Sequence, residues 1–196
     1  MRLWIALCAL MMVSPAWAEK LPLNDISRYL NTLKSAQGEF TQINDDGTLS
    51  TGKIYIKRPG RIRFEYNPPD QAVVVAGSGA VVVFDPKSNE APETYPLRRT
   101  PLSIILARTV DLGRANMVVG HGFDGTATVV TAQDPENPEY GRIDMMFTDA
   151  PTALRKWIIH DGSGGQTIII LGALDEDVRL SDGLFDVGDV GDAEER

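Results

Sequence analysis

The segment from residue 52 to residue 66, GKIYIKRPGRIRFEY, constrains the fold most because it joins two alternating runs by a turn. Pro59 presets the backbone angle of the second turn position and Gly60 tolerates a positive φ at the third, which predicts a type II turn from Arg58 to Arg61. Side chains alternate between the two faces of a strand, so the apolar residues of each arm share one face. The segment therefore predicts an antiparallel hairpin.

Arg58 falls on the apolar face of the first arm, in line with Gly52, Ile54 and Ile56. An unpaired cation is very costly to transfer from water into an apolar environment. We therefore expect hydrogen-bond acceptors or water next to the Arg58 guanidinium.

Residues 1–18 have the composition of an export signal. Arg2 is followed by an apolar run from residue 3 to residue 13, and Ala16 and Ala18 place small residues where a signal peptidase cleaves. The run is too short to span a bilayer, so we expect a soluble exported chain that starts at Glu19. The single cysteine, Cys8, would leave with the signal, which excludes disulfides, thiol catalysis and cysteine metal sites from the mature chain and argues against a lipid anchor.

The mature chain is acidic. Arg2 is the only charged residue of the signal and one of 19 Lys and Arg residues, so 18 cations face 27 acids and the net charge is −9. This balance disfavours nucleic acid and anionic membrane surfaces as primary partners. Acids gather in residues 182–196, which we interpret as a solvated, flexible tail; calcium binding is the alternative, although the spacing of a calcium loop is absent.

The remaining pattern is mostly β, with period-two runs separated by turn residues as in an antiparallel meander. Neither a linker nor a repeat divides residues 19–196, so we predict a single domain. The predicted strands span residues 39–43, 51–58, 61–66, 72–76, 80–84, 118–122, 126–131, 142–148, 153–160 and 166–173.

Two helices are predicted. The first has Ile26, Tyr29, Leu30 and Leu33 at helical spacing, with a cap at Asn24 or Asp25. The second follows a Thr100 cap, has Pro101 in its first turn and continues from residue 102 to residue 107. Nearly every side of the second helix is apolar, so it either packs in the core or covers the opening of a ligand cavity.

Three runs, at residues 72–76, 80–84 and 168–171, are apolar on both faces. Each face of such a strand is expected to meet apolar groups. A curled sheet satisfies this requirement if one face packs on helices and the other meets a neighbouring wall or lines a cavity.

Signals of catalysis are weak. His121 and His160 are far apart in the chain and form no close metal-ligand pair. The chain has no nucleophile elbow, phosphate loop or zinc-protease motif, and no carboxylate pair is marked out although acids are plentiful. We therefore predict a binding protein with no catalytic residue, metal or cofactor.

The order of these features resembles the LolA family of periplasmic carriers of outer-membrane lipoproteins. The residues that carry the resemblance are GEFTQ at 38–42, the hairpin with RPGRIRFEY at 58–66, Pro69, DP at 85–86 and the helix from Thr100 to Arg108. The resemblance covers residues 22–110 well and the remainder by strand pattern and length. At Ile62 and Phe64 the family often has Phe and Trp.

The resemblance implies an incomplete antiparallel β-barrel, lidded by short helices, that encloses an apolar cavity. In that family the arginine of the Arg-Pro pair holds the lid shut through hydrogen bonds, and the resemblance implies this role for Arg58. The expected cavity wall is Ile54, Ile56, Ile62, Phe64 and Tyr66, and the expected lid residues are Leu102, Ile105 and Leu106. The expected partners of this monomer are acylated lipoproteins, an inner-membrane ATP-binding-cassette release complex and, if one is present, an outer-membrane acceptor lipoprotein.

Two other classes remain open. One is an envelope-sensing or lipid-binding regulatory module on the same half-barrel. The other is a hydrolase with dispersed acids, which requires a buried acid with a perturbed pKa in the cavity.

Overall fold

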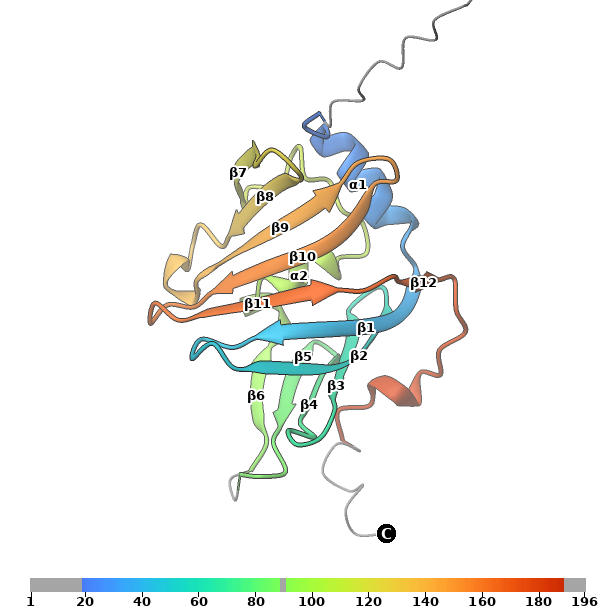
Figure 1. Ribbon diagram of the computed structural model, residues 1–196, viewed down its shortest axis with the longest axis vertical. Helices are drawn as coiled ribbons and strands as arrows, with labels where there is room; N and C mark the ends of the chain where they lie inside the picture. Colours follow the sequence, from blue (N-terminus) through green and yellow to red (C-terminus); the bar gives the residue numbers. More distant parts are fainter. Residues whose placement is uncertain (1–18, 89–90, 189–196) are drawn as a thin grey trace, which may run out of the picture.

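The computed structural model describes residues 19–88 and 91–188. Its main element is one antiparallel sheet with the strand order β6-β5-β4-β3-β2-β1-β11-β10-β9-β8-β7, with β12 paired to β1 (Figure 1). In the described residues the end strands β6 and β7 do not pair, so the barrel is incomplete, as expected. The strands are β1 (Ser35–Ile43), β2 (Leu49–Lys57), β3 (Arg61–Tyr66), β4 (Val73–Gly77), β5 (Ala80–Phe84), β6 (Glu93–Pro96), β7 (Val118–Phe123), β8 (Thr128–Gln133), β9 (Arg142–Thr148), β10 (Ala153–His160), β11 (Gln166–Leu171) and β12 (Asp175–Glu176).

The hairpin of β2 and β3 is confirmed. Ile54 pairs with Phe64 and Ile56 with Ile62, so the apolar residues of both arms share the inner face. Gly60 has a φ of +73°, which a residue with a side chain rarely adopts, and the Arg58–Pro59 peptide bond is cis.

Each strand predicted from the sequence is present, with shifts of a few residues at some ends. The largest shift is in β1, which begins at Ser35 instead of residue 39. Strands β6 and β12 were not predicted. All four residues of β6 and both residues of β12 are exposed, so neither strand has the buried alternation by which strands are recognised.

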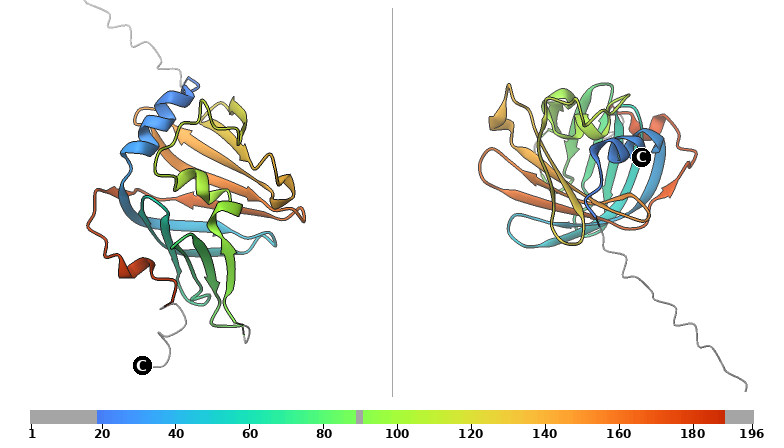
Figure 2. Two further views of the ribbon diagram at one scale, coloured as in Figure 1. Left: turned by 180° about the vertical axis from the view of Figure 1, so that it is seen from behind. Right: turned by 90° about the horizontal axis from the view of Figure 1, so that it is seen from above.

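Two helices lie on the concave side of the curved sheet (Figure 2). Helix α1 (Leu23–Thr32) begins two or three residues earlier than expected, because its N-cap is Pro22, so the predicted cap at Asn24 or Asp25 is wrong. Helix α2 (Leu102–Ile105) is one turn long and follows the 3-10 helix η1 (Leu97–Arg99). Thr100 does not cap α2, because its hydroxyl donates to the Leu97 carbonyl oxygen at 2.8 Å.

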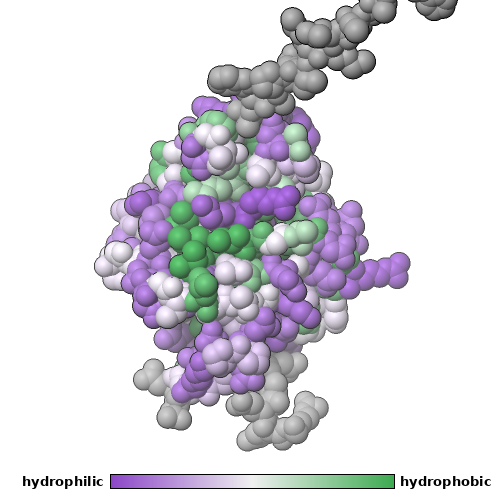
Figure 3. Space-filling model, viewed as in Figure 1, coloured by the Kyte–Doolittle hydropathy of each residue, from purple (hydrophilic) through white to green (hydrophobic). Residues whose placement is uncertain are grey.

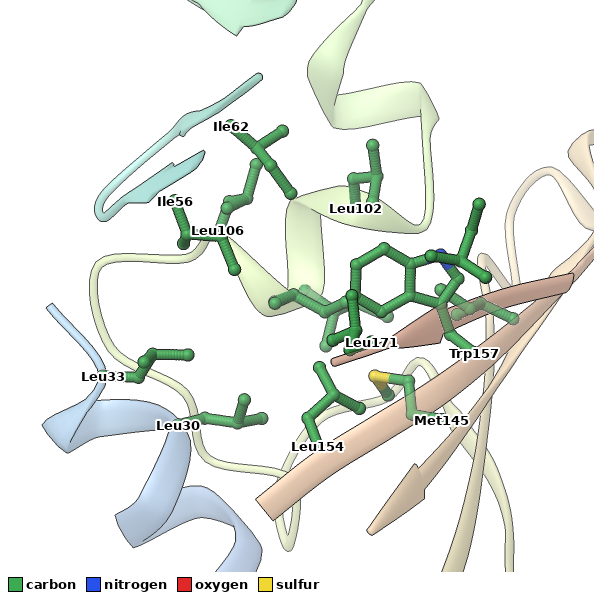
Figure 4. Close-up of a cluster of buried hydrophobic side chains, with 14 of the residues drawn as sticks. Leu30, Leu33, Ile56, Ile62, Leu102, Leu106, Met145, Leu154, Trp157 and Leu171 are labelled. Carbon is green, nitrogen blue, oxygen red and sulfur yellow. The ribbon is translucent and has the colours of Figure 1, made fainter. Parts of the chain in front are cut away.

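The main core fills the space between the concave face and the helices. It contains buried side chains from both halves of the sheet, from α1, from α2 and from the segment that follows α2. Figure 4 shows side chains from these elements converging on one interior. None of the described helices is long and apolar enough to cross a membrane.

The outer face of β4 and β5 is covered by the C-terminal segment. Phe185, in the 3-10 helix η3 (Gly183–Phe185), is buried against Val75 and Val82. Asp182 forms ion pairs with Lys57, at 2.6 Å, and with Arg61. We expected a solvated tail from residue 182, but Leu184, Phe185 and Val187 pack on the sheet; residues 189–196 lie outside the described residues.

The outer face of β11 differs from the expectation. Ile169 and Leu171 point into the core, whereas Ile170 is 41% exposed on the other face. Figure 3 shows apolar residues gathered on this outer surface, over the region of β1 and β11. The prediction that both faces of residues 168–171 meet apolar groups is therefore wrong for the outer face.

Candidate binding site beneath helix α2

The five residues predicted to form a cavity wall lie together on the inner face of β2 and β3. Ile54, Ile56 and Ile62 are fully buried, Phe64 is 5% exposed, and Tyr66 packs against the same cluster at the end of β3. Their alternation with polar residues on the outer face gives this hairpin one continuous apolar surface.

The three residues predicted to form a lid pack over that surface. Ile105 and Leu106 are fully or almost fully buried, and Leu102 is 9% exposed. In Figure 4, Leu106 lies beside Ile56 and Ile62, while Leu102 lies above the indole of Trp157. In this structure α2 covers the apolar surface of the hairpin.

A row of aromatic rings extends across the wall from β1 to β3. The Phe40 ring meets the Phe64 and Tyr66 rings edge to face at centroid distances of 5.3 and 5.1 Å. Gly52, directly opposite Phe40 on β2, makes this packing feasible, because a Cβ there would lie 2.8 Å from the Phe40 ring and 2.1 Å from the Glu65 carbonyl oxygen. The glycine at the start of the hairpin is therefore a packing requirement.

Tyr66 places a polar group at the edge of this wall. Its hydroxyl donates to the Gln42 Oε1 atom at 2.6 Å. Burial raises the pKa of Tyr66 to about 12, against an ordinary value of 10.0, because the phenolate would lose its hydration.

Arg58 joins the hairpin turn to the ends of both helices. Its Nη2 donates to the carbonyl oxygen of Ala107, which follows α2, and its Nη1 donates to the carbonyl oxygen of Leu33, which caps α1, at 3.4 Å. The backbone N–H of Gly60 donates to the Leu106 carbonyl oxygen at 2.8 Å. The turn therefore binds α2 at two successive carbonyl groups.

These contacts follow from the chemistry of helix ends. The last carbonyl groups of a helix have no partner within the helix and carry partial negative charge, so a cation is favourable there. Arg58 is 7% exposed, and in the described residues no carboxylate forms an ion pair with it. Burial lowers its pKa, and its Nε has no hydrogen-bond partner. The expectation of nearby acceptors is confirmed, although one donor remains unsatisfied.

Helix α1 holds the segment that follows α2. The Asn31 side chain donates to the Val110 carbonyl oxygen at 2.8 Å and accepts from the Val110 N–H at 2.9 Å. The Ser27 hydroxyl accepts from the Leu112 N–H at 3.0 Å. The backbone at residues 110–112 is therefore fixed to α1.

The second half of the chain supplies a wall that sequence reasoning missed. Its alternating patterns predicted strands but did not show which face points inward. The buried residues of this wall are Val130, Ala132, Ile143, Met145, Phe147, Leu154, Trp157, Ile169 and Leu171. The alternation within each strand separates its two faces, but which face is buried follows only from the packing of the folded sheet.

Both histidines have structural partners. His121 Nε2 lies 2.8 Å from the Leu21 carbonyl oxygen, and His160 Nε2 lies 2.8 Å from Asp144 Oδ2. In the described part of the chain, no three His, Cys, Asp or Glu side chains are grouped so that they could hold a metal ion. The candidate site is an apolar surface beside the Arg58 guanidinium, which donates hydrogen bonds to the carbonyl oxygens of Leu33 and Ala107.

Comparison with known proteins agrees with this architecture. The family model described as outer membrane lipoprotein carrier protein LolA matches residues 31–188. The chain belongs to the LolA family. Among LolA-family relatives, an outer-membrane lipoprotein carrier protein of Alkalilimnicola ehrlichii is 27% identical over 192 residues, covering 93% of this chain and 87% of that protein. The carrier protein of Cupriavidus taiwanensis is 24% identical over 199 residues, covering 94% and 92%.

Solved structures share the fold. A DUF1329 family protein from Desulfovibrio piger aligns with a TM-score of 0.51 at 15% identity, covering 86% of this chain and 96% of its own. A domain described as an outer membrane lipoprotein-sorting protein, from Vibrio parahaemolyticus, aligns with a TM-score of 0.50 at 10% identity, covering 86% and 97%. LolA-family membership gives the protein a carrier or binding role at the family level.

Proposed function

We propose that this protein carries acylated lipoproteins through the periplasm and delivers them to the outer membrane. The observation that carries the proposal is the closed apolar surface beneath α2, held shut by Arg58 at the ends of two helices. Its family membership and its full-length relatives named as carriers support the same role.

The apolar surface suits an acyl chain. An acyl chain that leaves a bilayer loses about 0.8 kcal/mol per methylene group unless its new surroundings are equally apolar. The two walls and α2 line the interior mainly with apolar side chains. We assign Ile54, Ile56 and Ile62 to the acyl-chain wall, and Phe64 and Tyr66 to its aromatic edge.

Leu102, Ile105 and Leu106 form the lid in this proposal. In the empty state they occupy the space that the acyl chains take, and they return when the chains leave. The membrane and the site beneath α2 are both apolar, so the free energy of the acyl chain is nearly the same in each. A difference of a few kcal/mol between the open and closed positions of α2 therefore decides whether lipoprotein is loaded or released. Arg58 favours the empty state because its hydrogen bonds to the lid exist only when the lid is closed.

The route follows from the same proposal. Residues 1–18 direct export and are removed, so that the mature chain, residues 19–196, acts as a periplasmic monomer. An inner-membrane ATP-binding-cassette complex loads it, and an outer-membrane acceptor lipoprotein receives the cargo. The carrier itself performs no chemical step.

The test is release of lipoprotein from spheroplasts of the source organism. The mature chain, with its folding checked by circular dichroism, is added to spheroplasts that make a lipoprotein or its unacylated cysteine variant. We expect a soluble one-to-one complex with the acylated form only. Absence of any complex would contradict carriage and favour a regulatory role on the same fold.

A further inference from the structure

Trp157 has a buried polar atom that the packing of the closed state does not satisfy. The side chain lies at the centre of β10 and is fully buried. Its Nε1 is one of two buried side-chain nitrogen or oxygen atoms in the described residues that have no hydrogen-bond partner; the other is Nε of Arg58. Both residues lie next to α2, because Leu102 lies above the indole in Figure 4 and Arg58 donates to the carbonyl oxygen of Ala107.

The surroundings of the indole are apolar. Figure 4 shows the ring between Leu102 of α2 and the strands that carry Met145 and Leu171, with its nitrogen on the edge turned away from Met145. The Phe64 ring is perpendicular to the indole at a centroid distance of 6.1 Å. An aromatic face is at best a weak acceptor, so the N–H loses most of its hydration energy without replacement.

A Phe or Leu at this position would fill an apolar core without this loss. Buried indole N–H groups usually find an acceptor. The position of Trp157 directly beneath the lid places its donor where an acceptor can enter from the ligand.

We infer that Trp157 Nε1 donates a hydrogen bond to a carbonyl oxygen at the head of a bound acyl chain when α2 opens. This inference rests on the proposed carrier function. An acyl chain has one polar group, the ester or amide carbonyl at its head, and that group also needs a donor when it leaves water. The indole N–H of Trp157 and the carbonyl oxygen of the acyl chain then form a hydrogen bond with each other, so neither is left without a partner.

The site therefore distinguishes acyl chains from alkyl chains. An ester-linked or amide-linked chain supplies the acceptor, whereas an ether-linked chain of equal length fills the same space and leaves Nε1 unpaired. Trp157 is then the residue that determines specificity for the carbonyl group, whereas the aliphatic walls bind ester-linked and ether-linked chains equally well.

The experiment combines a change in the ligand with a change in the protein. A diacyl lipopeptide and its dialkyl ether analogue of equal chain length are bound to the mature chain and to its Trp157→Phe variant. Affinities come from displacement of a fluorescent fatty-acid probe. In parallel, the mature chain is labelled with ¹⁵N-tryptophan, which gives one indole signal because Trp4 and Trp17 lie within residues 1–18.

The mature chain should bind the diester about 5- to 10-fold more tightly than the diether, as expected for one satisfied hydrogen bond. Trp157→Phe should bind both with equal affinity, and comparing the two ligands within one variant cancels any general loss of stability. The indole proton should shift downfield with the diester only.

Two results would overturn the inference in different ways. If Trp157→Phe keeps the preference of the wild type, or the indole signal responds alike to both ligands, Trp157 does not bind the carbonyl while carriage stands. If neither lipid binds to either protein, the proposed function itself fails and this inference fails with it.

Discussion

Arg58 and Ala107 are joined by a hydrogen bond from the guanidinium to the backbone carbonyl, across 49 positions of the sequence. The contact fixes the end of helix α2 to the turn between β2 and β3. A second bond from the same guanidinium reaches Leu33 at the end of α1. One side chain therefore holds both helices against the apolar wall, and its loss should favour an open lid.

Replacement of Arg58 by Leu should impair release more than binding. Hydrogen bonds to a charged group contribute about 1.5–3 kcal/mol, so the loss of one from the closed state should favour the loaded state about 10- to 160-fold. Transfer of a bound lipoprotein to outer membranes measures the effect. Arg61→Leu is the matched control, because Arg61 lies in the same hairpin but pairs with Asp182 on the outer face. Delivery at the wild-type rate by Arg58→Leu would exclude the latch.

Tyr66 should make the fold sensitive to alkaline pH. Its pKa is raised to about 12 in the folded chain from 10.0, so the folded state keeps a proton that the unfolded chain loses. The stabilisation is present below pH 10 and is lost as the pH rises to 12, which lowers the free energy of unfolding by about 2–3 kcal/mol. Denaturant unfolding of the wild type and of Tyr66→Phe at several pH values measures this.

The Tyr66→Phe variant separates this effect from the other tyrosines. The pKa values of Tyr29 and Tyr55 are also raised by burial, so their contribution persists in the variant. The decrease in the free energy of unfolding at alkaline pH should be smaller in Tyr66→Phe by the amount that Tyr66 contributes. Equal loss in both proteins would show that Tyr66 titrates as in the unfolded chain.

Gly52 should not tolerate a methyl group. A Cβ at Gly52 would lie 2.1 Å from the Glu65 carbonyl oxygen and 2.8 Å from the Phe40 ring, so Gly52→Ala should force the strands or the ring to move. We expect a loss of about 1–3 kcal/mol in the free energy of unfolding, measured by urea denaturation. Gly122→Ala, in β7 with nothing within 4 Å, should change stability little. Equal stability of the two variants would contradict this packing.

Several strands were predictable because their signal is local. The bounds of β3, β5, β9 and β10 match the sequence pattern, since each alternates or is continuously apolar and is bordered by turn residues. The pattern also placed Arg58 on the inner face and required acceptors for it. The acceptors themselves belong to residues 25 and 49 positions away, which periodicity does not identify; the family resemblance supplied the lid contact.

Other features depend on tertiary packing and left no local signal. Phe185 lies among acids and glycines, so the composition indicated a solvated tail although the ring is 3% exposed on the outer face of β4 and β5. The inward direction of Trp157 and its unsatisfied Nε1 depend on the register of β9, β10 and β11. The burial of Phe185 and the inward direction of Trp157 therefore follow from tertiary packing and not from the local sequence pattern.

The C-terminal segment should contribute to stability through Phe185. Phe185→Ala removes a buried ring from a cluster with Val75 and Val82, which should cost about 3–5 kcal/mol of the free energy of unfolding, or less if the segment detaches. Phe123→Ala is the matched control, because Phe123 is 37% exposed in β7. Thermal unfolding compares the two. If Phe185→Ala melts at the temperature of the wild type, the segment does not support the sheet.

Quenching of Trp157 by brominated acyl chains tests the central claim most directly. Residues 19–196 contain one tryptophan, Trp157, which is fully buried beneath α2. A lipopeptide with brominated acyl chains and an unbrominated copy are bound to saturation, as established by native mass spectrometry. If acyl chains enter beneath the lid, bromine should quench most of the fluorescence while the unbrominated copy does not. If both lipopeptides bind to saturation and Trp157 fluorescence is the same with each, the acyl chains bind away from Trp157, which would contradict binding beneath α2.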